Sequence, residues 1–140
     1  MEREQLTLSL RHPALLLRTS DWGFSASVAV ELRSAFEMVQ AADGDAALFE
    51  RAYAALKPLL PRRMSRGERL LAYHILAQCA GQWDLAEAVA YGSRALELAT
   101  DAQDQGAIVD ILHLRGIQFR RASELRAAEF DYAQLLAYLR

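Results

Sequence analysis

Two histidines are the residues of this chain whose chemistry best suits a ligand or a metal ion. His74 and His113 are related by a sequence offset of 39, and Asp110 lies one helical turn before His113. Imidazole and carboxylate groups are common zinc ligands in proteins. Two histidines without a short fixed spacing do not define a metal site, and a histidine on an exposed helix face is usually only solvated. We therefore predict no metal ion and no cofactor.

The sequence has no recognisable catalytic motif. No glycine-rich phosphate loop follows a strand, and no H-E-x-x-H motif occurs. Three histidines, one cysteine and scattered serines do not by themselves define a catalytic triad. We therefore predict a protein that is not an enzyme and has no catalytic residues.

Composition indicates one helical domain of ordinary size. The chain has 140 residues, of which 53% are hydrophobic and 24% charged, so it can bury a core. A net charge of -2 does not suggest a nucleic-acid partner. No apolar run approaches the ~18 residues of a membrane span, and the polar residues 1–5 do not begin a signal sequence. We expect a cytoplasmic protein without membrane contact, and a buried, inert thiol at Cys79.

Six helices are expected from residue 25 onward, because N-capping residues precede apolar stripes of helical period. The expected spans are 25–42, 46–57, 66–80, 85–99, 103–121 and 124–139. The expected N-caps are Ser25 or Ser27, Asp45, Ser65 with Glu68 as a capping box, Asp84 and Ser123. Residues 1–24 are irregular, and we expect them to form an N-terminal capping segment on a repeat domain spanning 25–140.

Two stretches of the chain match one another. Residues 73–78 align with 112–117 at an offset of 39, and Ala88 aligns with Ala128 at an offset of 40, after a loop that we expect to be one residue longer in the second copy. A self-match at this period predicts helical hairpins stacked in an array. Ala47, at an offset of 41 from Ala88, is expected to be the matching small residue of the first hairpin, whose first helix has no clear register.

The repeat resembles the tetratricopeptide repeat (TPR), in a long form of about 40 residues. That motif reads W-x2-L-G-x2-Y in the first helix and A-x3-F in the second. The matching positions of the last repeat are Leu112, Arg115, Gly116, Phe119, Ala128 and Tyr132, and those of the middle repeat are Tyr73, Leu76, Ala77, Ala80 and Ala88. Two departures are Gly92, where the motif has an aromatic residue, and Arg115, where it has leucine. The resemblance covers residues 26–140.

The resemblance implies an all-α fold of about three antiparallel hairpins stacked as a right-handed superhelix, similar to the repeats of kinesin light chains and of bacterial regulators. In this family the first helix of each hairpin lines a concave groove. The corresponding residues of this chain are Leu71, His74, Gln78, Asp110, His113, Ile117 and Arg120. The resemblance thus implies a non-enzymatic module that binds a peptide or partner protein, within a larger bacterial regulatory or scaffold protein. A domain that senses a small molecule or signalling peptide, and a purely structural dimerisation unit, remain as alternatives.

Two groups of arginines offer bidentate donors to carboxylates or phosphates. They are Arg62, Arg63, Arg66 and Arg69, and Arg115, Arg120, Arg121 and Arg126. Either group could anchor an acidic peptide or a chain terminus. We favour a structural interpretation, in which these arginines complement helix C-termini and pair with neighbouring acids such as Glu124 and Glu129.

The last expected helix has an apolar surface too broad for one partner helix. Its large apolar residues are Leu125, Phe130, Leu135, Leu136, Tyr138 and Leu139. A repeat array normally ends in a helix with a polar outer face. We therefore expect a second copy of the chain, or further repeats of a longer protein, to pack on it.

Overall fold

A computed structural model of the chain describes residues 26–42 and 44–139, and throughout this part the regular structure is helical. The elements are α3 (Ala26–Ala42), α4 (Ala46–Leu56), the short 3-10 helix η2 (Lys57–Leu59), α5 (Arg66–Ala80), α6 (Leu85–Asp101), α7 (Gln105–Arg121) and α8 (Leu125–Leu139). The predicted all-α class is confirmed. The predicted capping segment, 1–24, lies outside the described residues. None of the described helices is both long and apolar enough to cross a bilayer.

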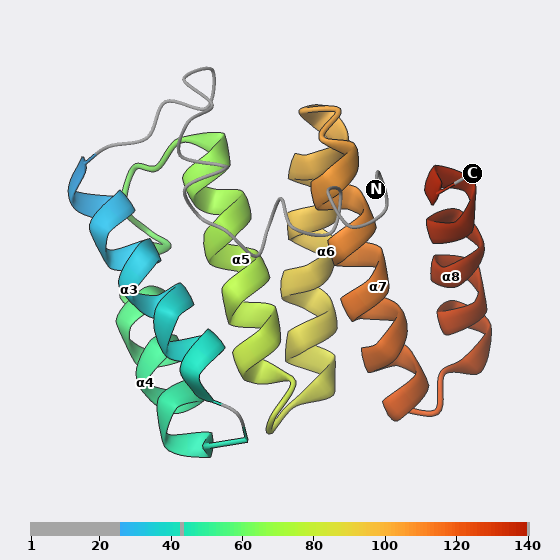
Figure 1. The fold of residues 1–140 in the computed structure, drawn as a ribbon, viewed down its shortest axis with the longest axis horizontal. Helices are drawn as coiled ribbons and strands as arrows, with labels where there is room; N and C mark the ends of the chain where they lie inside the picture. Colours follow the sequence, from blue (N-terminus) through green and yellow to red (C-terminus); the bar gives the residue numbers. More distant parts are fainter. Residues whose placement is uncertain (1–25, 43, 140) are drawn as a thin grey trace.

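The helices pack in chain order (Figure 1). Contacts join α3 to α4, α5 to α6 and α7 to α8, and further contacts of α4 with α5 and of α6 with α7 link these pairs. Helix α3 also contacts α5. Helices α3, α5 and α7 all end at the lower edge of Figure 1, where short turns reverse the chain into α4, α6 and α8. Each pair is therefore antiparallel.

Local capping explains where three of the helices begin. The Asp45 carboxylate accepts from the Ala47 backbone N–H, and the Asp84 carboxylate accepts from the Glu87 N–H. Ser65 and Glu68 form the predicted capping box, with both reciprocal hydrogen bonds present. These side chains satisfy backbone donors that have no partner inside the helix.

The end of α6 and the role of Ser123 differ from expectation. Helix α6 continues to Asp101 instead of ending at 99. Ser123, the expected N-cap of the last helix, has a left-handed backbone with φ +61. Gln103, in the turn after α6, is also left-handed, with φ +55. The next residues donate backward across the turn, from Asp104 N to the Ala99 carbonyl (3.1 Å) and from Glu124 N to the Phe119 carbonyl. Ser123 is therefore the left-handed residue that ends α7, a position that usually holds glycine.

The second matching stretch is one residue longer than the first, and the difference arises in a helix instead of in the turn. Helix α7 has 17 residues and α5 has 15, whereas the turn 122–124 is one residue shorter than the turn 81–84. The expected longer loop was therefore wrong. Ala47 was also misassigned, because it lies in the exposed first turn of α4, whereas Ala52 is the fully buried alanine of that helix.

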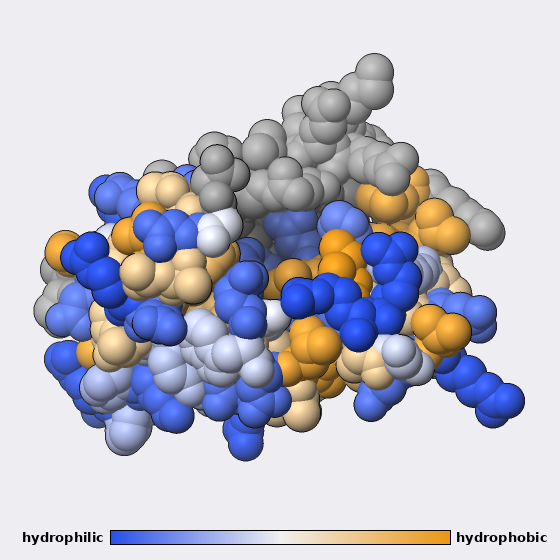
Figure 2. Space-filling view, turned by 90° about the horizontal axis from the view of Figure 1, so that it is seen from below, coloured by the Kyte–Doolittle hydropathy of each residue, from blue (hydrophilic) through white to orange (hydrophobic). Residues whose placement is uncertain are grey.

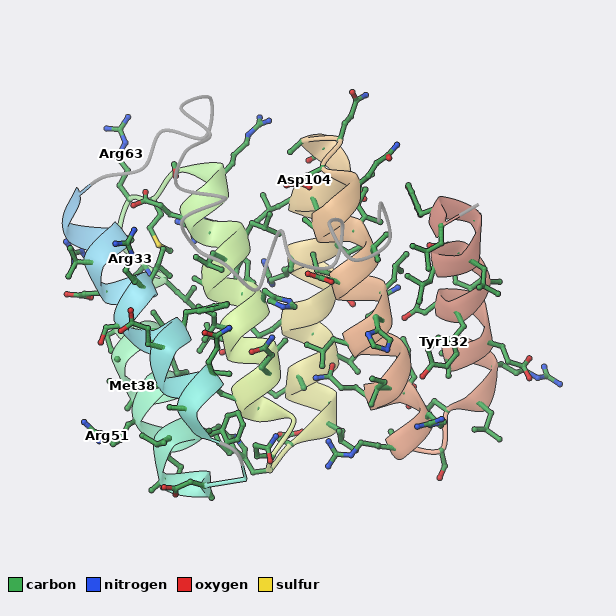
Figure 3. The ribbon with its side chains drawn as sticks, viewed as in Figure 1. Arg33, Met38, Arg51, Arg63, Asp104 and Tyr132 are labelled. Atoms are coloured by element: carbon green, nitrogen blue, oxygen red, sulfur yellow. The ribbon has the colours of Figure 1, made fainter. Side chains whose placement is uncertain are left out.

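The core is centred on α5, which packs against α3 and α4 on one side and α6 on the other. The largest fully buried apolar side chains of the core are Leu32, Leu56, Leu70, Leu71, Ile75, Leu76, Ile111 and Leu112. Small residues allow close approach between α7 and α8, where a Cβ on Gly116 would lie 2.8 Å from the Tyr132 ring. Figure 3 shows Tyr132 reaching from α8 toward α7, whereas Arg51 and Arg63 point away from the helices.

Candidate functional site

A cavity lies between the C-terminal ends of α3, α5 and α7. Its lining residues are Val39, Phe49, Gln78, Gly81, Gln82, Leu114, Ile117, Gln118 and Arg121. Two of them, Gln78 and Ile117, are among the predicted groove residues, so the structure brings these two together. Figure 2 views this end of the molecule and shows hydrophobic patches bordered by hydrophilic side chains.

Three of the lining residues are evenly spaced in the sequence. Val39, Gln78 and Ile117 follow one another at a constant offset of 39 and come from α3, α5 and α7. The spacing is the same as the offset between the matching stretches. Each of the three helices thus contributes one residue to this cavity at the same sequence spacing.

Gln118 connects α7 to α5 at the wall of this cavity. The side chain is 2% exposed, and its Nε2 donates to the Ala77 carbonyl over 3.0 Å. Its Oε1 is buried and accepts no hydrogen bond. A Cβ on Gly81 would lie 3.2 Å from Gln118 Nε2, so Gly81 leaves room for the amide. Gln118 was not predicted, and its only sequence signal is a polar residue one position beyond Ile117.

His74 has a structural environment. It is 4% exposed, and the Gln78 amide nitrogen donates to its Nε2 over 3.0 Å. His113 is exposed on α7, and neither histidine lines the cavity. The expected pair of groove histidines therefore occupies two different environments.

The other predicted groove residues lie outside the cavity. Leu71 is fully buried in the core and was therefore misassigned as a lining residue. Asp110 is buried, whereas Arg120 is exposed on α7. Within 26–42 and 44–139, no three His, Cys, Asp or Glu side chains are grouped closely enough to hold a metal ion.

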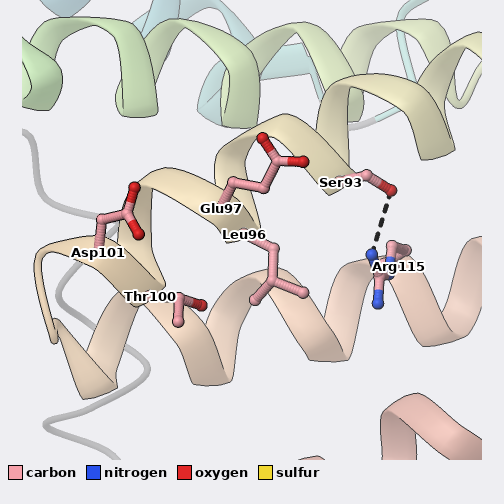
Figure 4. A pocket seen from close by; sticks show the side chains of 6 residues that line it. All are labelled: Ser93, Leu96, Glu97, Thr100, Asp101 and Arg115. Atoms are coloured by element: carbon pink, nitrogen blue, oxygen red, sulfur yellow. Dashed lines mark hydrogen bonds between the residues drawn. The ribbon is translucent and has the colours of Figure 1, made fainter.

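A second cavity lies beside α6 (Figure 4). Its lining residues are Ser93, Leu96, Glu97, Thr100 and Asp101 of α6 and Arg115 of α7. Arg115 donates to Ser93 Oγ over 3.1 Å and, through Nε and Nη2, to both carboxylate oxygens of Asp131. The cation of this cavity is therefore already paired within the chain.

Three of the arginines bond to other parts of the chain. Arg115 pairs with Asp131, not with the expected Glu124 or Glu129. Arg69 donates to the carbonyls of Leu60 and Arg62 and so fixes the linker before α5, and Arg121 donates to the Gly81 carbonyl over 3.2 Å. For Arg69, Arg115 and Arg121, the structural interpretation agrees with these contacts.

An aromatic cluster joins α4 to the turn before α6. Tyr53 donates to Glu87 Oε1 over 2.9 Å and accepts from Lys57 Nζ over 2.9 Å. The Trp83 ring meets the Tyr53 ring edge to face, with centroids 5.0 Å apart. Burial, followed by the hydrogen bond to Glu87, raises the pKa of Tyr53. The Trp83 ring thus packs from this turn onto α4.

No protein-family model, curated protein or solved structure matches the chain.

Proposed function

We propose that the chain is a non-enzymatic, TPR-like protein-interaction module that binds an extended peptide segment of a partner protein in the cavity between α3, α5 and α7. The observation that carries this proposal is the repeat position that Val39, Gln78 and Ile117 share, at a constant offset of 39, in three helices. A surface to which every repeat contributes the same position suits a ligand that runs along the array.

The lining chemistry suits a peptide. Its apolar walls are Val39, Phe49, Leu114 and Ile117, and its amide side chains are Gln78, Gln82 and Gln118. Apolar walls accept a hydrophobic side chain, and a few placed polar groups fix the orientation of the ligand. Side-chain amides both donate and accept, as a peptide backbone does.

The Gln118 side chain predicts one chemical feature of the ligand. A buried carbonyl oxygen without a donor costs free energy, roughly 1–3 kcal/mol. Its Oε1 is in that state, while its Nε2 is held by Ala77. Since this oxygen is buried, a peptide N–H can supply the missing donor only when the Gln118 side chain turns toward the cavity. We therefore expect ligands to combine an apolar side chain with a backbone N–H beside it.

The test is selection of random dodecapeptides on the full chain, followed by titration of the enriched peptides against two variants. Gln82→Trp places a bulky ring at an exposed position of the lining. Gln105→Trp makes the same change at an exposed position that begins α7, at its opposite end. We expect Gln82→Trp to weaken binding at least tenfold and Gln105→Trp to leave it unchanged.

Two results would overturn the proposal. One is selection that enriches no peptide on the folded chain. The other is enriched peptides that bind both variants with wild-type affinity, since the cavity would then not be their site. Circular dichroism of both variants verifies that the helices are intact.

A further inference from the structure

Three arginines near the linker between η2 and α5 are exposed and unpaired. Arg62, Arg63 and Arg66 form no ion pair with any residue of 26–42 and 44–139. Pairing with neighbouring acids, which was expected for these arginines, therefore does not account for them. Arg66 is also the first residue of α5, where the positive end of the helix dipole disfavours a cation. A charge placed against the local field and left without a counterion suits an external partner.

The linker is fixed to the fold at several points. Arg69 donates to the carbonyls of Leu60 and Arg62 over 3.0 and 3.1 Å. The side chains of Leu60 and Met64 pack against the core, and Ser65 takes part in the capping box of α5. A surface whose backbone is already ordered loses less conformational entropy when a ligand binds. Arg62, Arg63 and Arg66 thus form a preorganised cationic surface, the linker arginine patch.

The charge of the linker arginine patch is opposite to that of the rest of the chain. The whole chain has a net charge of -2 and the three arginines contribute +3, so the remaining residues carry -5. The patch is also short, because residues 62–66 span at most about 14 Å when fully extended. It therefore offers a local cationic surface to an anionic group of similar length.

A short acidic peptide segment fits the patch in both charge and length. Four residues of extended chain span about 13 Å, which is close to the length of the patch. Guanidinium groups bind carboxylates through two parallel hydrogen bonds. Membranes and nucleic acids carry much longer runs of negative charge, which the net charge of -5 on the remaining residues would repel.

We propose that Arg62, Arg63 and Arg66 bind a run of acidic side chains in a partner protein. This surface is separate from the cavity between α3, α5 and α7. Helix α5 begins at the upper edge of Figure 1, at the patch, and ends at the lower edge, at the cavity. Its 15 residues extend about 22 Å. The proposal thus stands independently of peptide binding in the cavity.

Fluorescence anisotropy of a labelled peptide, titrated with the full chain, tests the proposal. The probe is a capped peptide in which four consecutive acidic residues are flanked by glycine and serine. Exposed ion pairs are weak and screened by salt, so the titration extends to about 1 mM chain at about 50 mM salt. We expect the triple variant Arg62→Glu/Arg63→Glu/Arg66→Glu to bind the probe at least tenfold more weakly than the wild type.

A second triple variant separates the patch from the overall charge. Arg33→Glu/Arg51→Glu/Arg126→Glu reverses three exposed arginines outside the patch and gives the same net charge as the first variant. We expect its affinity for the probe to stay within about threefold of the wild type, since distant exposed charges are screened. All six substituted positions are exposed, and circular dichroism verifies the helix content of both variants.

Two further peptides test the chemistry and the length of the segment on the wild-type chain. One replaces the four acids by their amides and is expected not to bind. The other has the same composition with the acids spread along the whole peptide, and we expect weaker binding because the patch is short. These comparisons need no substituted chain, so they remain valid however the variants fold.

Four results would contradict the proposal. The first is a wild-type chain that does not bind the probe. The second is equal binding of the clustered peptide and either of the other two. The third is an equal loss in both triple variants, which would assign binding to net charge. The fourth is a patch-dependent interaction with phosphatidylserine vesicles or with an oligothymidine that exceeds peptide binding, which would identify a different partner.

Discussion

Arg115 of α7 and Asp131 of α8 form a bidentate ion pair in which both nitrogen–oxygen distances are 2.7 Å. The Asp131 side chain is 1% exposed and the Arg115 side chain 13%. The remaining guanidinium nitrogen donates to Ser93 of α6. One side chain therefore joins three helices.

Removing one partner of this pair should be strongly destabilising. Asp131→Ala leaves the Arg115 cation mostly buried without its counterion, and such a change costs about 3–5 kcal/mol of the free energy of unfolding. Urea denaturation followed by circular dichroism measures the loss. We expect a clear decrease in the midpoint at neutral pH.

The double variant Arg115→Leu/Asp131→Leu is the informative comparison. It removes both charges, so the buried pair becomes an apolar contact. We expect a smaller loss of stability than for Asp131→Ala alone, because no buried charge is left unpaired. Losses that simply add across the two positions would argue against coupling between them.

Two helix glycines should respond in opposite ways to the same substitution. A Cβ on Gly92 would contact the Arg115 side chain at an ordinary 3.8 Å, so Gly92→Ala is expected to stabilise the chain by roughly 0.5–1 kcal/mol. A Cβ on Gly116 would lie 2.8 Å from the Tyr132 ring, so Gly116→Ala is expected to destabilise it by about 1–3 kcal/mol. Thermal and urea denaturation compare the two. Effects of the same sign would contradict the packing at one of these sites.

Local signals made most of the helices predictable. Asp45, Ser65 and Asp84 each cap a helix through their own side chains, and the apolar periodicity marks which residues are buried. The role of Ser123 after the end of α7 was not predictable in this way. Ser123 occupies a left-handed position without being glycine, and the hydrogen bonds of the turn hold it there.

Pairings distant in sequence were not predictable. Gly92 of α6 and Arg115 of α7 are distant in sequence, yet a Cβ on Gly92 would lie 3.8 Å from the Arg115 side chain. Nothing in the local pattern indicates Asp131 as the partner of Arg115, or Ala77 as the partner of Gln118. The repeat pattern predicted that Gln78 and Ile117 line one surface, and both do line one cavity. The pattern could not show that His74 is buried.

Cys79 should be inert in the native chain. It is fully buried, and burial raises the pKa of its thiol to about 12. Because the thiolate is the reactive form, we expect modification by a thiol reagent at pH 8 to be roughly 100-fold slower than in denaturant, or slower still. A Cys79→Ala chain with Gln105→Cys, an exposed thiol, is the control and should react at once. Equal rates for the two thiols would contradict the burial of Cys79.

Tyr91 should make the chain sensitive to alkali. Burial, followed by the hydrogen bond with Tyr53, raises its pKa from 10.0 to about 12. Unfolded chains lose this proton near pH 10 and the folded chain keeps it to about pH 12, so the free energy of unfolding falls as pH rises between these values. Cys79 titrates in an overlapping window, so the measurement uses a Cys79→Ala background. There we expect Tyr91→Phe to reduce the alkaline loss of stability, whereas an unchanged pH dependence would assign it to other groups.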